Sequence, residues 1–178
     1  MPVRRKHIEH LADRILKDAG VDGPAVPVER IARSKGLDVR KQKIPNSDIS
    51  GFLFQRGTIA IIGVNARHSH ARQRFTIAHE LGHVLLHGSL PNEFHVDRRF
   101  QIRFRDLRSS QGIDIEERES NFFAAELLMP SRFLVKDFAA TNQLDMVDDE
   151  VIAKLASRYG VSAQALLFRL ANLGYIML

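Results

Sequence analysis

Apolar side chains recur at helical spacing through most of the chain. In residues 4–19 they fall at Ile8, Leu11 and Ile15, which share one face of a helix, and a glycine follows the run. The same kind of pattern predicts further helices over residues 28–34, 69–87, 113–129, 132–139, 150–159 and 162–172. The chain is therefore predicted to be mostly helical.

Three short segments have the character of strands. They cover residues 37–44, 51–55 and 58–64, and the Arg56-Gly57 pair indicates a tight hairpin between the last two. Residues 89–112 have little periodicity and are rich in arginine, so we interpret them as a long loop. Because no linker interrupts the chain, we predict one α+β domain over residues 1–178, with a small three-stranded antiparallel sheet.

The composition is that of an ordinary globular protein. With 178 residues and 44% hydrophobic residues, the chain is long enough to bury a core as one domain. No apolar stretch approaches the ~20 residues that span a bilayer, and the basic N-terminus leads into an amphipathic segment rather than a signal sequence. We therefore expect a cytoplasmic protein with no membrane partner. Since the chain has no cysteine, any metal site must be built from histidines and carboxylates.

The charge balance is moderately basic. Lysine and arginine number 26 against 21 aspartates and glutamates, which gives a net charge of +5. Such a charge permits contact with nucleic acid or with acidic proteins, although a solvated basic surface is the simpler interpretation.

Residues 79–83 read His-Glu-Leu-Gly-His, an H-E-x-x-H sequence inside a predicted helix. Residues four apart lie about 40° apart on a helix and one turn along it, so His79 and His83 can bind one zinc ion. Glu80 can accept a proton from a metal-activated water without occupying a coordination position, as a general base.

The helical wheel of residues 69–87 supports this interpretation. The apolar side chains around the motif gather in an arc of about 140–260° measured from His79, whereas His83 and His87 fall at about 40° and 80°. One face is thus expected to pack in a core while the other presents imidazoles to a cleft. The alternative is a helix that merely carries exposed histidines.

A catalytic zinc usually has a third protein ligand. His87 follows His83 by four residues, whereas the metzincin pattern needs six, so a carboxylate from another helix is the better candidate. In the helix predicted over residues 113–129, Glu117 shares a face with small and apolar side chains, where an unpaired carboxylate would cost several kcal/mol. Glu117 is therefore the preferred third ligand, and the other glutamates of this helix are expected to point largely outward: Glu116, Glu119 and Glu126.

Two further roles follow from this face. Asn121 lies one turn after Glu117 and can hydrogen-bond a ligand imidazole, which fixes its tautomer. The alternative for Glu117 is an ion pair with an arginine such as Arg72 or Arg74.

Two longer motifs resemble a known family. Residues 74–87 read RFTIAHELGHVLLH and residues 117–130 read ERESNFFAAELLMP. They resemble the ImmA/IrrE metallopeptidases, whose pattern is R-F-T-x-A-H-E-x-G-H followed by E-x-x-A-N-x-F-A-x-x-L-L-M-P, with Ser120 standing where the family commonly has alanine. The order of the flanking elements also agrees, so the resemblance covers most of the chain.

The resemblance implies a zincin-like fold and a zinc-dependent endopeptidase, with His79, His83 and Glu117 as ligands of Zn²⁺ and Glu80 as general base. It further implies a protein substrate, a helix-turn-helix transcriptional repressor that is cleaved or otherwise inactivated. We hypothesise that a substrate strand pairs with an exposed sheet edge, for which residues 58–64 are the candidate.

The C-terminal residues 150–173 favour a competing interpretation. They resemble a helix-turn-helix, which would make the protein a DNA-binding regulator. In its second helix Gln164, Arg169 and Asn172 are the residues able to reach bases or phosphates, which is few for sequence readout, so direct DNA binding is the less favoured hypothesis. A third possibility is a protein that binds its repressor without hydrolysing it.

Overall fold

The computed structural model describes residues 2–56, 59–88, 95–98, 113–139 and 148–177. Its helices are α1 (Arg5–Asp18), α2 (Val28–Ser34), α3 (His70–His87), α4 (Ile113–Leu128), α5 (Ser131–Ala139), α6 (Asp149–Tyr159) and α7 (Ala163–Asn172). Its strands are β1 (Leu37–Gln42), β2 (Ile49–Arg56), β3 (Ile59–Asn65) and β4 (His95–Arg98). The predicted α+β class, mostly helical with one small sheet, is confirmed.

The sheet differs from the prediction in its order and direction. The strands lie in the order β1-β3-β2-β4, with β1 parallel to β3 and β2 antiparallel to both of its neighbours. Strand β4 lies within residues 89–112, which the sequence pattern assigned to a loop, so four strands form a mixed sheet. Because β3 is a central strand, the hypothesis that residues 58–64 offer a free edge to a substrate is wrong.

The connection between β1 and β2 explains this order. Residues 43–48 form a connection that is longer than a tight hairpin, and β3 lies between the two strands that it joins. Asn65, at the end of β3, holds this connection in place. Its amide nitrogen donates to the Ile49 carbonyl at 2.9 Å, and its Oδ1 accepts from the Ile44 N–H at 3.3 Å.

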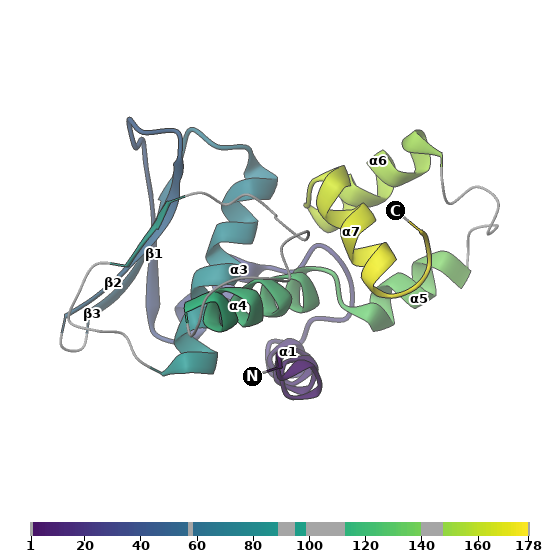
Figure 1. Cartoon of the computed structure of the whole chain (residues 1–178), viewed down its shortest axis with the longest axis horizontal. Helices are drawn as coiled ribbons and strands as arrows, with labels where there is room; N and C mark the ends of the chain where they lie inside the picture. The colour runs from purple at the N-terminus through teal and green to yellow at the C-terminus, as the bar shows by residue number, and fades with distance from the viewer. Residues whose placement is uncertain (1, 57–58, 89–94, 99–112, 140–147, 178) are drawn as a thin grey trace.

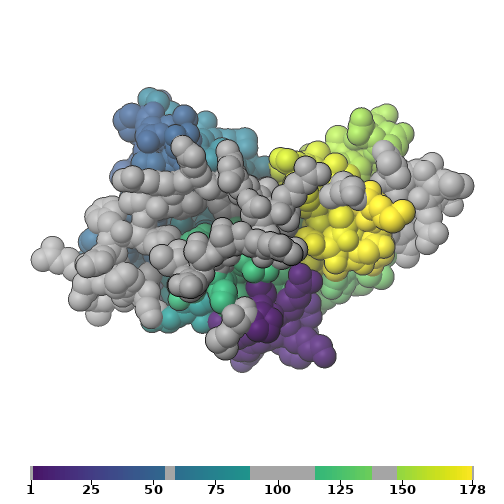
Figure 2. Space-filling view, in the orientation of Figure 1, coloured from purple at the N-terminus to yellow at the C-terminus, as the bar shows by residue number. Residues whose placement is uncertain are grey.

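The core lies between the sheet and the helices. One sheet face buries Val39, Leu53 and Ile62, and helix α3 packs on β2 and β3 with Ile77 and Leu81 fully buried. Helix α4 packs against α3 and α1, while α5, α6 and α7 lie beyond α3, on the side away from the sheet (Figure 1). The space-filling view shows the C-terminal helices at one end of the molecule and α1 along an edge (Figure 2).

Among the described residues, no helix is both long and apolar enough to cross a membrane.

Candidate metal centre

Helix α3 is well defined at both ends and carries the H-E-x-x-H sequence in its second half. Ser69 caps its first turn by accepting a hydrogen bond from the Arg72 N–H, and Gly88 ends it in the left-handed conformation with φ of 62°. His79 and Glu80 are completely buried, whereas His83 and His87 are partly exposed. The helix therefore runs from the core toward the surface along the motif.

His79, His83 and Glu117 converge, as the sequence predicts. The Nε2 atoms of the two histidines are 3.0 Å apart, and the Glu117 carboxylate lies 3.4 Å from His79 Nε2 and 3.1 Å from His83 Nε2. Tetrahedral zinc with bonds of about 2.0–2.1 Å separates its ligand atoms by about 3.3 Å. The three donor groups, all within 4.8 Å of one another, therefore fit one metal ion.

Electrostatics favour the ionised form of Glu117. Burial raises the pKa of its carboxyl, but hydrogen bonds and charge from His79 and His83 outweigh this and hold the pKa well below its usual range. The group is thus a carboxylate, which is the form that binds a metal.

Asn121 lies one turn after Glu117 on α4 and contacts the first histidine. Its Oδ1 is 3.1 Å from His79 Nδ1. Because an amide oxygen only accepts, this contact assigns a proton to Nδ1, and Nε2 is the ring nitrogen that faces Glu117 and His83. The contact predicted for Asn121 is thus present, and its role toward a metal ligand stays a prediction.

The proposed alternative partners of Glu117 are engaged elsewhere. Arg72 donates to Ser50 Oγ at 2.8 and 3.2 Å, and Arg74 donates to the carbonyls of Val26 and Gly160 at 2.7 and 3.0 Å. Glu117 therefore faces the two histidines rather than either arginine.

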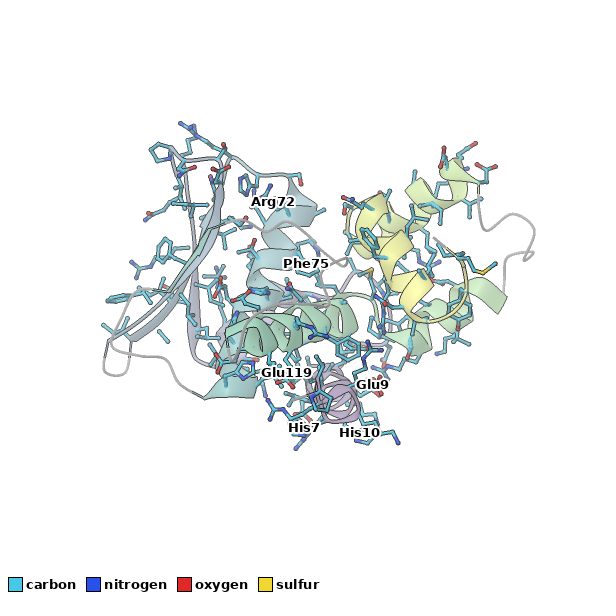
Figure 3. The ribbon with its side chains drawn as sticks, in the orientation of Figure 1. His7, Glu9, His10, Arg72, Phe75 and Glu119 are labelled. Carbon is cyan, nitrogen blue, oxygen red and sulfur yellow. The ribbon has the colours of Figure 1, made fainter. Side chains whose placement is uncertain are left out.

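The prediction that Glu119 and Glu126 point outward is wrong. Both are buried, with exposed fractions of 1% and 6%, whereas Glu116 is exposed as predicted. The reason is that α4 has other helices on its polar side as well. Glu119 points from α4 toward α1 (Figure 3), where it binds Arg4 through contacts of 2.6–3.1 Å, and Glu126 binds Arg169 of α7 at 2.7 Å.

The surroundings of these two carboxyls shift their pKa values in opposite directions. Hydrogen bonds from Arg4 lower the pKa of Glu119, whereas burial raises the pKa of Glu126 despite its arginine partner. Arg4 and Arg169 were missed as partners because they lie 115 and 43 residues away in the sequence.

Helices α6 and α7 are joined by a short turn, in the region that the sequence analysis compared with a helix-turn-helix. Gly160 ends α6 with φ of 65°, and Ser162 caps α7 by accepting from the Ala165 N–H at 3.1 Å. Gln164 and Asn172 are exposed, but Arg169 is only 3% exposed and binds Glu126. The assignment of Arg169 as a residue that could reach DNA is therefore wrong, because its guanidinium is used inside the molecule.

Comparisons with known proteins place the chain in a sequence family. Residues 32–171 match the model of the IrrE N-terminal-like domain of M78 peptidases. The chain is 33% identical over 121 residues to the radiation response metalloprotease IrrE of Deinococcus deserti, which is 63% of this chain but 36% of that protein. The chain thus spans little more than a third of that relative.

Among solved structures, a Mycobacterium tuberculosis transcriptional regulator has a similar fold, with a TM-score of 0.65. The match covers 93% of this chain and 46% of that chain. At 17% sequence identity it is a likeness of fold alone.

Proposed function

The chain belongs to the M78 peptidase family, which is described by its IrrE N-terminal-like domain. On this basis we propose that the protein is a zinc-dependent endopeptidase. Its metal ligands would be His79, His83 and Glu117. The observation that carries the proposal is the convergence of these three donors, 3.0–3.4 Å apart, from two different helices. Two imidazoles and a carboxylate are a donor set that catalytic zinc sites use, and it needs no cysteine, which the chain lacks.

The proposed chemistry assigns a separate task to each residue. Zinc would supply Lewis-acid activation of a water molecule and of the scissile carbonyl. Glu80 takes the proton from the attacking water and passes it to the leaving amine as the peptide bond breaks. Asn121 accepts a hydrogen bond from His79 Nδ1 and so orients the ring with Nε2 toward the position of the metal.

Complete burial of Glu80 suits the task of a base. A carboxylate enclosed in this way is shielded from bulk water, which would otherwise compete for the proton that it accepts. Its position directly after a ligand in the same helix fixes it relative to the metal.

We further propose that the substrate is a protein, namely a helix-turn-helix transcriptional repressor. The support is the resemblance of residues 74–87 and 117–130 to the ImmA/IrrE metallopeptidases. Direct DNA binding by α7 is the less favoured alternative, because Arg169 is committed to Glu126 and leaves few polar groups for base readout.

The substitution Glu80→Gln tests the proposal. The variant should bind one zinc ion like the native protein but fail to cleave a repressor substrate, with cleavage followed by mass spectrometry of the products. Glu116→Gln is the matched control, since it makes the same chemical change at an exposed position of α4, and it should cleave normally.

The result also separates cleavage from mere binding. A protein that inactivates its repressor only by binding it would keep full activity as Glu80→Gln. Full repressor inactivation by this variant would therefore contradict the peptidase assignment while leaving the metal site intact.

A further inference from the structure

Two arginines connect the C-terminal helix pair to the two helices that carry the candidate metal ligands. Arg74 extends from α3, which carries His79 and His83, to the turn between α6 and α7. Arg169 extends from α7 to α4, which carries Glu117. Each ligand helix is thus held by the same pair of helices, at a point away from the metal site.

Arg74 caps the C-terminus of α6. Its Nε donates to the Gly160 carbonyl at 3.0 Å, and one terminal nitrogen donates to the carbonyls of Tyr159 at 3.5 Å and Val26 at 2.7 Å. The last carbonyls of a helix have no partner within it and carry the negative end of its dipole, so they stabilise a guanidinium placed there.

Gly160 is required for this arrangement. A Cβ at this position would lie 2.8 Å from Arg74 Nε, and the φ of 65° already favours glycine. The turn glycine of a helix–turn–helix is here also the docking point for an arginine of the metal helix.

Arg169 makes the second connection inside the protein. It is 3% exposed, its Nε donates to the Met129 carbonyl at 3.1 Å, and a terminal nitrogen binds Glu126 at 2.7 Å. Both acceptors lie in the second half of α4 or directly after it. This buried contact therefore fixes α7 to the part of α4 that is distant from Glu117.

Helices α3 and α4 cross closely at Gly82 and Ser120, where a Cβ on Gly82 would lie 3.1 Å from Ser120 Cα. The two helices pack on each other over many residues, and contacts far from the crossing add to what fixes its angle. Arg74 lies about 12 Å from this crossing along α3, and Glu126 about 9 Å along α4, at 1.5 Å per residue. These distant contacts therefore have the leverage to fix the crossing angle.

The leverage is large enough to affect the metal site. A shift of about 1 Å at Arg74 rotates α3 by about 5° and moves His79, about 4.5 Å from the crossing, by about 0.4 Å. Metal–ligand distances in proteins hold within about 0.2 Å of their ideal values. Loss of either arginine contact would thus disturb the ligand geometry.

We propose that Arg74 and Arg169 are positioning residues, which brace the ligand-bearing helices α3 and α4 through the C-terminal helix pair and so set the geometry of the metal site. This inference rests on the metal site of the proposed function. It gives the helix–turn–helix pair a role in the peptidase that does not involve DNA.

The test uses the full chain with Co²⁺ as the probe, because its visible absorption reports the coordination geometry directly. The variants are Arg74→Met and the double variant Arg169→Met with Glu126→Met. The double change removes both charges, since Arg169→Met alone would leave the Glu126 charge buried without its partner. Arg74→Lys keeps the charge but reaches fewer carbonyls.

Tyr159→Phe is the matched control. It removes the hydrogen bond from Tyr159 Oη to Asp137 at 2.8 Å, which joins α5 to α6 without touching α3 or α4, and it keeps the Tyr159 carbonyl. The control therefore weakens the C-terminal helices while leaving both arginine contacts in place.

We expect Arg74→Met and the double variant to bind Co²⁺ at least tenfold more weakly and with an altered absorption spectrum. Arg74→Lys should lie in between, and Tyr159→Phe should match the native protein even if its thermal stability falls. A native Co²⁺ affinity and spectrum in both Arg74→Met and the double variant would overturn the inference. If Arg74→Met does not fold, a native affinity and spectrum in both Arg74→Lys and the double variant would overturn it. Failure of the native protein to bind Co²⁺ would instead refute the metal site itself.

Discussion

Adding one methyl group where α3 and α4 cross, by the substitution Gly82→Ala, should weaken metal binding. In Gly82→Ala the new Cβ would lie 3.0 Å from Phe123 Cδ1, 3.1 Å from Ser120 Cα and 3.3 Å from the Ser120 carbonyl oxygen. Carbon atoms pack at about 3.5–4.0 Å, and the backbone of Ser120 cannot rotate away as a side chain can. Helix α4 must therefore move away from α3 by roughly 0.4 Å to reach the lower end of that range.

This shift has different effects on stability and on metal binding. Overpacking costs about 1–3 kcal/mol, but alanine favours a helix interior by about 1 kcal/mol over glycine, so the net loss of stability is small. Glu117 moves with α4 by more than the roughly 0.2 Å that coordination distances allow. We therefore expect metal affinity to fall by about 10- to 100-fold, as when the groups around a ligand are disturbed.

The assay is a chelator competition titration with Zn²⁺, together with denaturant unfolding of the metal-free protein. Adding Phe123→Leu to Gly82→Ala removes the contact with the ring but not those with the Ser120 backbone, so affinity should stay low. Native affinity in Gly82→Ala would refute the argument that the close crossing of α3 and α4 sets the ligand geometry.

Three further predictions concern stability and the surroundings of the ligands. Hydrogen bonds from Arg4 lower the pKa of Glu119 in the folded protein. The ionised carboxylate therefore stabilises the folded state near neutral pH. This stabilisation is lost as the pH falls from the pKa of Glu119 in the unfolded chain through its pKa in the folded protein. Glu119→Gln should thus cost about 1–2 kcal/mol at pH 7 but little at acidic pH, measured by denaturant unfolding at both. Asn121→Ala should weaken zinc binding about 10- to 100-fold in a competition titration, because His79 loses its orienting partner. Gly160→Ala should lower the unfolding free energy by about 1–2 kcal/mol, since φ is 65° there; an unchanged value would contradict this.

The local part of the site could be predicted from the sequence. The spacing of His79 and His83 fixes their relation within one helix, and the small, apolar face around Glu117 identified the third ligand candidate. Asn121 followed from the same helical wheel, because residues one turn apart share a face. Each of these inferences needs the geometry of only one helix.

The long-range part could not be predicted in the same way. A helical wheel assumes that the side opposite the apolar face meets solvent, but α4 has α1 beside Glu119 and α7 beside Glu126. Likewise, hydrophobic pattern identifies β3 but not its neighbours, and only the route of residues 43–48, fastened by Asn65, places it at the centre of the sheet.

Zinc content per chain tests the central claim most directly. Elemental analysis should find about one zinc in the native protein and much less in Glu117→Ala, with Glu116→Ala matching the native protein because Glu116 is exposed on the same helix. A native protein that is folded yet contains no zinc, even after the metal is supplied, would contradict the assignment of His79, His83 and Glu117 as a zinc site.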